Sequence, residues 1–445
     1  MKKVLIITYH FPPDAEVGGL RVQKFAKYLP LYGWEPLILS VDEKYYPLKD
    51  AERNHSINCE VFRTKVFWSP REAYLKMKGL FQSISGKAKN TQQATVESVG
   101  EGSVELMDRS VSGLKRFILS LLWLPDDRTG WIVPAVINGF KLIKKYNIKT
   151  VVTTSPPHSV QIIGLLLKKI LHFRWVVDFR DPWSLQLRDE LKFSCRIERW
   201  IEKKVIGNAD VVLTTSEVIN RDYIKAYPVL FAKKFIYIPN GFDLEDFNLV
   251  RSKLDRKEGK FIISYLGEFY QRRTPEVFLR ATSDLLKNGM ISVEKLQLKF
   301  IGKVRYFGTK SLEDLISELK LSFVTEIIDH VRYLKAIEYM LKSSVLLIFS
   351  PQPWALTTKV FEYIATGAYI IAFTPPGALA DLVNKYPRGI VVALDDVEEA
   401  KKAIMFCYDN FRKLDGNEEH EPLETEDILR DFDRKNLTKQ LSQYL

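Results

Sequence analysis

Residues 4–31 read VLIITYHFPPDAEVGGLRVQKFAKYLPL and contain three successive features of one structural unit. The short run Val4–Thr8 predicts a buried strand, because it is apolar and rich in β-branched side chains. A turn that ends in Gly18-Gly19 follows, and the amphipathic spacing after it predicts a helix over Leu20–Leu31. A strand, a turn and a helix in this order are typical of the βαβ units that build parallel sheets.

The same alternation of short apolar runs and amphipathic stretches continues along the chain. In the first half, further strands are predicted at Glu35–Val41, Thr150–Thr154, Trp175–Phe179 and Val211–Thr215, and a helix at Val133–Lys145. In the second half, strands are predicted at Phe261–Gly267, Leu296–Gly302, Val324–Ile328, Val345–Ser350 and Tyr369–Phe373. Helices are predicted between them at Pro275–Lys287, Leu312–Leu319, Leu334–Lys342 and Lys359–Thr366. We therefore expect an α/β protein with two doubly wound parallel sheets.

The rhythm breaks at the polar stretch Asn248–Lys260, which marks the best domain boundary. Residues 1–245 and 246–430 are expected to form one Rossmann-like domain each, facing each other across a cleft, with ligands at the carboxyl ends of the strands. Residues 82–112 carry no aromatic side chain and are rich in Ser, Gly, Gln and Thr, which predicts a mobile loop. Residues 431–445 are expected to form a helix that reaches back to the first domain.

The charge of the chain is unevenly distributed between its two halves. The 445 residues have a net charge of +11, and their ordinary composition excludes a collagen, a coiled coil or a wholly disordered chain. Residues 1–250 hold 37 basic and 27 acidic side chains, whereas residues 251–445 hold 29 and 28. The first half is therefore expected to meet an anionic partner, such as a membrane surface, nucleic acid or a phosphorylated substrate.

The compartment signals favour the cytoplasm. Cys59, Cys195 and Cys407 lie far apart and form no disulfide framework, so they are expected to be free thiols. The apolar run near the start is too short for a signal peptide, and no run approaches the length of about 18 residues that a spanning helix needs. The protein is expected to be soluble or peripheral, with a possible place on the inner face of the cell membrane.

Three segments suit the binding of phosphate groups. Gly18-Gly19 lets backbone N–H groups approach an anion at a helix start, although a plain tight turn explains the pair equally well. Arg272 and Arg273 follow the strand-ending Gly267, where adjacent guanidinium groups suit a diphosphate; the alternative is a solvated pair on a loop.

The third segment is Trp354–Gly367, the most informative stretch of the chain. Thr357 or Thr358 is a predicted N-cap, so the free N–H groups of the helix and Lys359 are expected to point towards a phosphate. Glu362 lies one turn further and suits the two hydroxyl groups of a ribose. The alternative for Glu362 is that it complements the helix dipole.

Polar side chains also follow two strands of the first half. Ser155, His158 and their neighbours close one predicted strand, and Asp178, Arg180 and Asp181 close the next. His158 is a candidate base, although a lone His is more often structural. An internal ion pair is the alternative for the three charged residues.

With these motifs in order, the sequence resembles bacterial retaining glycosyltransferases of family 4, which have the GT-B architecture. The segments that carry the resemblance are Gly18-Gly19, Leu124–Trp131, Ser155–His158, Asp178–Trp183, Pro239–Gly241 and Lys359–Gly367. They span nearly the whole chain, and their order and spacing together are specific. Enzymes that assemble surface polysaccharides on lipid carriers are the most similar.

The resemblance implies roles for individual residues. Glu362 matches the ribose-binding carboxylate, Arg273 stands where the family usually has a diphosphate-binding Lys, and Gly19 matches the glycine that approaches the donor phosphates. The residues expected to bind the donor are Gly18, Gly19, Arg272, Arg273, Thr357, Thr358, Lys359 and Glu362. The candidate catalytic residues are His158, Ser155 and Asp181, with no metal ion and no further cofactor required.

The sequence departs from the family pattern at three positions. Glu268 replaces an Arg after the strand glycine, and Trp354 replaces the first Glu of a pair spaced by eight residues. The second change favours a donor with fewer free hydroxyl groups, such as a deoxy or N-acetyl sugar. The cleft His of the family lies nearer the position of Ser155 than that of His158, so the resemblance leaves open which of these two contacts the sugar.

These observations predict a hexosyltransferase that moves a sugar from a UDP- or GDP-linked donor to an acceptor with retention of configuration. The basic first domain suits an anionic acceptor at a membrane, such as a lipid-linked saccharide, and the stretches Trp68–Phe81 and Leu114–Trp123 are candidates for docking on anionic lipid. Buried helices are the alternative for both stretches. The other functional hypotheses are a nucleotide-sugar epimerase on the same fold and a nucleic-acid-binding protein, and the second is disfavoured because no such motif occurs.

Overall fold

The computed structural model describes residues 1–50, 58–68, 124–186, 193–227, 233–254, 259–269, 273–413 and 426–445. The predicted loop 82–112, the docking stretch Leu114–Trp123, all of Trp68–Phe81 except Trp68, and Arg272 lie outside these residues. The described chain divides into two compact units. Unit 1 contains Met1–Thr214, Asn220–Tyr237 and Leu441–Leu445, and unit 2 contains Thr215–Ile219 and Ile238–Gln440.

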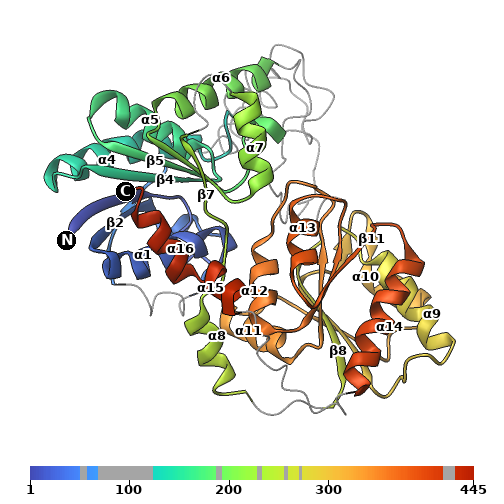
Figure 1. Ribbon diagram of the computed structural model, residues 1–445. Coiled ribbons are helices and arrows are strands. Elements are labelled where there is room, and N and C mark those ends of the chain that lie inside the picture. Colours follow the sequence, from blue (N-terminus) through green and yellow to red (C-terminus); the bar gives the residue numbers. More distant parts are fainter. Residues whose placement is uncertain are drawn as a thin grey trace, which may run out of the picture. The chain divides into compact units, whose positions relative to one another are not determined.

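Unit 1 is built on a seven-stranded parallel sheet (Figure 1). Its strands are β1 (Lys2–Ile7), β2 (Trp34–Val41), β3 (Glu60–Thr64), β4 (Thr150–Ser155), β5 (Arg174–Phe179), β6 (Val211–Thr214) and β7 (Phe235–Tyr237). Their order in the sheet is β3-β2-β1-β4-β5-β6-β7, so the direction of winding reverses between β1 and β4. Ligands of doubly wound folds bind outside the carboxyl ends of the strands at such a switch point.

The helices of unit 1 connect these strands as right-handed crossovers do. They are α1 (Leu20–Tyr28), α4 (Ile132–Lys145), α5 (Ser159–Ile170), α6 (Phe193–Asn208) and α7 (Glu217–Ala226), whose first turn is grouped with unit 2. The predicted helix Leu20–Leu31 ends as α1 at Tyr28 and continues as a 3-10 turn over Leu29–Tyr32, where Pro30 removes a backbone donor.

Unit 2 repeats the architecture with a six-stranded parallel sheet. Its strands are β8 (Phe261–Glu268), β9 (Leu296–Lys303), β12 (Thr325–Ile328), β13 (Val345–Phe349), β14 (Tyr369–Phe373) and β15 (Gly389–Val392), in the order β12-β9-β8-β13-β14-β15. A small antiparallel pair, β10 (Tyr306–Phe307) and β11 (Lys310–Ser311), lies outside this sheet. The switch point of unit 2 lies between β8 and β13.

Helices cover both faces of the unit 2 sheet. They are α8 (Leu244–Arg251), α9 (Glu276–Lys287), α10 (Leu312–Glu318), α11 (Tyr333–Lys342), α12 (Thr358–Thr366), α13 (Ala378–Lys385) and α14 (Val397–Lys413). Side chains of β8 alternate between two apolar cores: Ile263 and Tyr265 pack with α9 and α14, and Leu266 packs with α11 and α12. This alternation follows from the two-residue period of a strand that is buried on both faces.

The end of the chain forms two short helices, of which the second lies within the range 431–445 predicted to be helical. They are α15 (Glu426–Phe432) and α16 (Arg434–Ser442), and Asp433 between them forms a bridge with Phe242. Past the end of α16, the carbonyl of Tyr444 accepts a hydrogen bond from Arg174 Nε at 2.7 Å, within unit 1.

The expected α/β class with two doubly wound parallel sheets is confirmed. All three cysteines are free thiols, and burial raises the pKa of Cys59 to about 11. Among the residues that the structure describes, no helix has the length and hydrophobicity needed to cross a bilayer.

Candidate functional site

The switch point of unit 2 gathers charged side chains from β8 and α12. Helix α12 begins after the N-cap Thr357, whose hydroxyl accepts a hydrogen bond from Lys359 N at 3.4 Å. The first N–H groups of a helix have no backbone partner, and the Thr357 side chain provides one for Lys359 N. The helix therefore presents its positive end, together with Lys359, beside the carboxyl end of β8.

Lys359 occupies the centre of this group. A Cβ atom added to Gly267 would lie 3.3 Å from Lys359 Cε, so the lysine side chain runs directly over the glycine that ends the apolar part of β8. Burial lowers the pKa of the Lys359 ammonium; the charge of Glu362 opposes this shift, and that of Arg273 adds to it. Since the charges of Glu362 and Arg273 both act on Lys359, we group these three side chains as one site.

Glu362 lies one helical turn inside α12 and has only 5% of its surface exposed. The next residue, Tyr363, anchors the helix to the sheet, since its hydroxyl accepts a hydrogen bond from Leu266 N at 3.3 Å. At the end of β13, the buried hydroxyl of Ser350 has no hydrogen-bond partner. The site thus holds a buried carboxylate, two cations and a helix N-terminus.

Close backbone packing shapes the floor of this site. Gly302 ends the core of β9 with φ +114, and a Cβ atom there would lie 2.2 Å from the Gly267 carbonyl oxygen. No side chain fits at that position, so β8 and β9 approach each other closely at their carboxyl ends.

At the switch point of unit 1, Arg180 connects the loop after β1 with the loop after β4 through hydrogen bonds. Its guanidinium group donates hydrogen bonds to the carbonyl oxygens of Gly18 and Pro156, and its Nε donates to the Ser155 carbonyl at 3.1 Å. A Cβ atom at Gly18 would lie 2.8 Å from Arg180 Nη1, whereas one at Gly19 would meet only ordinary contacts, the nearest at 3.5 Å. A side chain at position 18 would therefore displace the end of Arg180, whereas one at position 19 would displace no neighbouring atom.

Ser155 and Asp178 have structural partners. Ser155 is fully buried, and its hydroxyl accepts a hydrogen bond from Gln161 Nε2 at 3.0 Å. Asp178 accepts two hydrogen bonds from Arg21, each 3.1 Å long, and both side chains are nearly inaccessible. The alternative of an internal ion pair is correct for Asp178, but its partner is Arg21 of α1.

His158 lies at the start of α5, half-buried and stacked on an indole ring. Its imidazole is parallel to Trp183, with ring centroids 4.8 Å apart and planes 3° apart. Its Nδ1 is buried without a hydrogen-bond partner. Burial lowers the pKa of His158 to about 3, with a further contribution from the positive charge of Arg180. The imidazole is therefore neutral near pH 7, and its low proton affinity suits a hydrogen-bonding group better than a general base.

Two carboxyl groups that were not predicted as site residues lie around this pair. Trp183 Nε1 donates to Glu198 Oε2 at 2.9 Å, and burial raises the pKa of Glu198 to about 7. Asp126 Oδ2 accepts a hydrogen bond from Ser159 N at 2.8 Å and so caps α5 next to His158, while burial raises its pKa to about 6. Asp181, the third candidate catalytic residue, is half-buried, and burial raises its pKa against the opposing charge of Arg180.

A second imidazole lies in the turn after β1. His10 Nδ1 is 2.7 Å from Asp14 Oδ2, and Asp14 is fully buried. A carboxylate on one ring nitrogen orients the imidazole and leaves the other nitrogen to act on a substrate. This pair is not among the residues predicted from the sequence. Its signal in the sequence is the i, i+4 spacing of His10 and Asp14.

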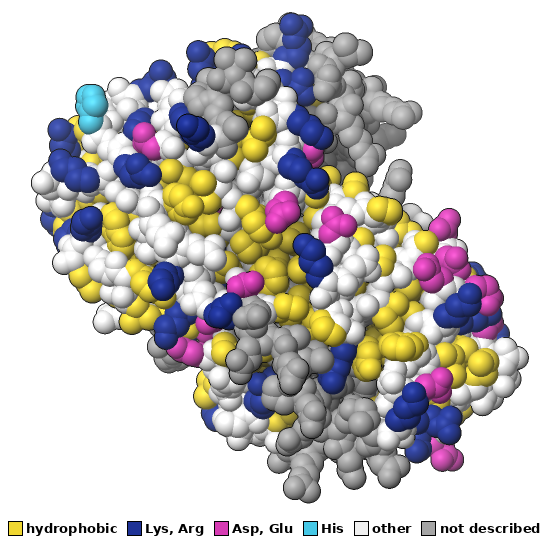
Figure 2. All heavy atoms as spheres, viewed as in Figure 1, with side chains coloured by type: hydrophobic (Ala, Val, Ile, Leu, Met, Phe, Trp, Pro, Cys, Tyr) yellow, Lys and Arg dark blue, Asp and Glu magenta, His cyan; other side chains and the backbone are white. Residues whose placement is uncertain are grey.

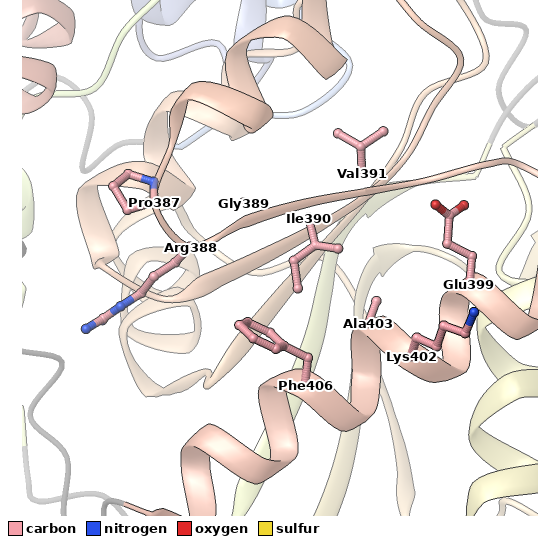
Figure 3. A pocket seen from close by; sticks show the side chains of 9 residues that line it. All are labelled: Pro387, Arg388, Gly389, Ile390, Val391, Glu399, Lys402, Ala403 and Phe406. Carbon is pink, nitrogen blue, oxygen red and sulfur yellow. The ribbon is translucent and has the colours of Figure 1, made fainter.

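A shallow pocket of about 360 Å³ lies elsewhere in unit 2, between the edge strand β15 and α14. Figure 3 shows Ile390 and Phe406 facing each other there, while Arg388 points away. None of the residues predicted from the sequence to bind a donor lines this pocket. Within the described ranges, no group of three or more His, Cys, Asp and Glu side chains is placed to hold a metal ion.

Residues 246–415 match the model of a protein family described as Glycosyl transferases group 1. The matched segment includes β8, α12 and the charged site at the unit 2 switch point. None of the curated proteins matches the sequence.

Solved structures resemble the whole chain. A glycosyltransferase from Rickettsia africae is 15% identical with a TM-score of 0.60, over 100% of this chain and 97% of its own. A sucrose-phosphate synthase from Thermosynechococcus elongatus is 16% identical with a TM-score of 0.62, over 100% and 98%. The HepE protein of Anabaena, solved with UDP and glucose, is 15% identical with a TM-score of 0.60, over 100% and 99%. At these identities the similarity concerns the fold, which is of the GT-B type.

Proposed function

We propose that this chain is a retaining glycosyltransferase of family 4, which transfers a hexose from a nucleoside-diphosphate sugar to an acceptor. The observation that carries the proposal is the group of Arg273, Lys359 and Glu362 at the switch point of unit 2. This group lies within the segment that matches the Glycosyl transferases group 1 model.

The donor would bind through its diphosphate and its ribose. Arg273, Lys359 and the N–H groups at the start of α12 offer positive charge to a diphosphate, with Arg272 as a further candidate. Glu362, held in place by the packing of α12, offers two oxygen atoms to the ribose hydroxyl groups. UDP and GDP are both candidates, and binding of UDP by a protein of the same fold supports the first.

The reaction breaks the bond between the anomeric carbon and the diphosphate oxygen and forms a bond from the same carbon to an acceptor oxygen. The acceptor hydroxyl proton leaves with the diphosphate or is taken up by a base. The cations around Lys359 stabilise the charge that develops on the leaving group. His158, Ser155 and Asp181 are the proposed catalytic residues of unit 1, and the oriented pair His10–Asp14 is added to them.

Gly18 and Gly19 would face the donor phosphates. Gly19 supports this proposal, since no neighbouring atom of the protein requires a glycine there and the missing side chain leaves room for a ligand. Residues 1–245 would form the acceptor domain and residues 246–430 the donor domain.

The acceptor is proposed to be a saccharide on a lipid diphosphate carrier, used for surface polysaccharide at the cytoplasmic face of a membrane. The basic first half, with 37 basic and 27 acidic residues before position 251, supports an anionic acceptor and peripheral association with anionic lipid. A soluble sugar phosphate is also anionic, and a sucrose-phosphate synthase has the same fold. The test therefore includes a lipid-linked saccharide and a sugar phosphate as acceptors.

The test incubates the protein with UDP- and GDP-sugars, with a lipid-linked saccharide, with a sugar phosphate and without acceptor. Transfer to the lipid-linked saccharide is expected, and NMR of the product should show the anomeric configuration of the donor. Inversion would contradict the retaining mechanism. A changed donor sugar in the absence of acceptor would show an epimerase, and salt-sensitive binding of RNA or DNA without donor turnover would show a nucleic-acid-binding protein.

A further inference from the structure

The helices α4, α5 and α6 follow one another on one side of the unit 1 sheet (Figure 1). They connect strands that advance in one direction across the sheet, so right-handed crossovers place all three on the same face. Gly139 of α4 meets Leu167 of α5, since a Cβ atom at Gly139 would lie 2.9 Å from Leu167 Cδ1. The outer surface of this layer, which we term the helix-layer face, combines two unusual properties.

The first property is a charge of one sign. Between Thr129 and Val177 the chain contains no Asp or Glu, so α4 and α5 carry none. The two acidic residues of α6 turn inward: Glu198 binds Trp183, and Glu202 is fully buried with Ser184, Tyr223 and Tyr227. The exposed basic residues of the face are Lys141, Lys144, Lys145, Lys169, Arg196, Arg199, Lys203 and Lys204.

Carboxylates at the margins of the layer do not neutralise this face. Asp210 is paired with Lys168 at 2.8 Å, and Glu60 accepts a hydrogen bond from Tyr146 at 3.1 Å. On the side of unit 1 that Figure 2 shows, dark-blue side chains are spread among yellow patches, and magenta side chains are fewer.

The second property is a set of exposed apolar side chains between these cations. On α4, Val133, Ile137 and Phe140 are 54%, 44% and 37% exposed, at the i, i+4, i+7 spacing of one stripe. On α5, Leu166 and Ile170 are 39% and 59% exposed. On α6, Trp200 is 62% exposed, with Lys204 Nζ 5.7 Å from the centre of its ring system.

We propose that the helix-layer face docks on the surface of an anionic lipid bilayer. Amphipathic surfaces with Lys and Arg around Trp, Phe and Leu lie in the bilayer interface, where the cations meet anionic headgroups and the apolar side chains enter the acyl boundary. This inference deepens the proposed function, on which it rests, by naming the surface that brings unit 1 to a lipid-linked acceptor.

Two other occupants fit the face less well. A second copy of the chain would place the same cations against one another, and the repulsion opposes such a dimer. A nucleic acid would satisfy the cations but would leave the aliphatic stripes of α4 and α5 in contact with phosphates and water.

The test measures co-sedimentation of the full chain with vesicles of phosphatidylcholine alone or with phosphatidylglycerol. One variant removes charge, Lys141→Gln/Lys144→Gln/Lys169→Gln/Lys203→Gln, and a second removes apolar surface, Ile170→Ser/Trp200→Ser. The control variant Lys402→Gln/Phe406→Ser makes the same kinds of change on α14 of unit 2, where Lys402 is exposed and Phe406 is 55% exposed.

Wild type and the control are expected to bind the anionic vesicles and to be released by about 0.5 M NaCl. The charge variant should bind roughly a hundred- to a thousandfold more weakly and the apolar variant about tenfold more weakly, while both keep the melting temperature of wild type. Equal binding to both kinds of vesicle, or variants that bind as wild type does, would overturn the proposal. So would a dimer in solution that either variant converts to a monomer, since a second copy would then occupy the face.

A donor thermal-shift measurement without vesicles separates this inference from the proposed function. If wild type gives the donor shift and transfers sugar but does not bind anionic vesicles, only the docking surface is overturned. Absence of any donor shift with normal vesicle binding overturns the glycosyltransferase proposal and leaves the surface in place.

Discussion

The imidazole of His158 lies parallel to the indole of Trp183, with ring centroids 4.8 Å apart. The indole is held in turn by its hydrogen bond to Glu198, so the orientation of the His158 imidazole depends on a ring and a carboxyl group that follow it by 25 and 40 residues. Trp183 is a positioning residue in this arrangement, and its removal should affect turnover more than donor binding.

The variant Trp183→Leu is therefore expected to lower kcat by about ten- to a hundredfold, because His158 loses the surface that fixes its ring. The donor affinity of unit 2 should stay within a factor of about two, which a thermal-shift titration measures. Trp183→Phe keeps a stacking surface and should restore most of the activity. If Trp183→Phe is as inactive as Trp183→Leu, stacking is not the function of this ring.

Glu198 should make the stability of the protein depend on pH. Its pKa is raised from 4.5 to about 7 in the folded state, so the folded protein binds the proton more tightly than the unfolded chain does. The stability that this group contributes is fully present below about pH 4.5 and is lost as the pH rises through about 7. Glu198→Gln should thus increase the free energy of unfolding at about pH 8 and change it little at about pH 4.5.

Denaturant unfolding of wild type and variant at both pH values provides the measurement. Glu294→Gln, at an exposed Glu in the turn before β9, serves as the control and should show no such pH-dependent difference. A Glu198→Gln variant that is destabilised equally at both pH values would show that the carboxyl group is charged in the folded protein.

The neighbouring glycines Gly18 and Gly19 should respond differently to the same substitution. Gly18→Ala places a Cβ atom 2.8 Å from Arg180 Nη1, so the guanidinium group must shift and lose a hydrogen bond, which should destabilise the protein by about 0.5–1.5 kcal/mol. Gly19→Ala meets only ordinary contacts and should keep the stability of wild type, but the added methyl group would enter the space proposed for the donor phosphates. Unfolding curves and donor titrations of both variants distinguish the two effects, and normal donor binding by Gly19→Ala would remove Gly19 from the proposed site.

The sequence predicted the central strands well because they are buried on both faces and form continuous apolar runs. In the two parallel sheets, the strands that it missed all lie at a sheet edge: β3 (Glu60–Thr64), β7 (Phe235–Tyr237) and β15 (Gly389–Val392). An edge strand is short and partly exposed, and the burial pattern of β3 shows one fully buried position in five. The hydrophobic pattern of β3 is therefore too weak to distinguish a strand from a loop.

The unpredicted parts of the site depend on contacts between distant segments. Asp126 caps α5 from 33 residues earlier in the chain, and Arg21 reaches Asp178 across 157 residues. No local sequence pattern predicts such pairs, because an Asp or Arg at these positions could equally be exposed to solvent. By contrast, Thr357, Lys359 and Glu362 belong to one helix start, and their spacing alone placed them together.

The donor site of unit 2 offers the most direct test of the proposed function. Arg273→Ala and Lys359→Ala should each weaken the binding of UDP or GDP by about ten- to a hundredfold, since each loses a charge-assisted hydrogen bond of about 1.5–3 kcal/mol. Glu362→Gln should weaken binding of the ribonucleotide and reduce its preference over the 2′-deoxyribonucleotide, because the amide replaces one of two acceptor oxygen atoms with a donor.

Thermal-shift titrations with each nucleotide measure all three effects. The matched controls are Arg280→Ala, an exposed guanidinium group paired with Glu276, and Glu338→Gln, a partly exposed carboxylate between Lys335 and Lys342. Both controls should bind as wild type does, because neither is among the charged groups around Lys359. Wild-type affinity in Arg273→Ala and Lys359→Ala together would show that the diphosphate does not bind at the start of α12, and the assignment of unit 2 as the donor domain would then be wrong.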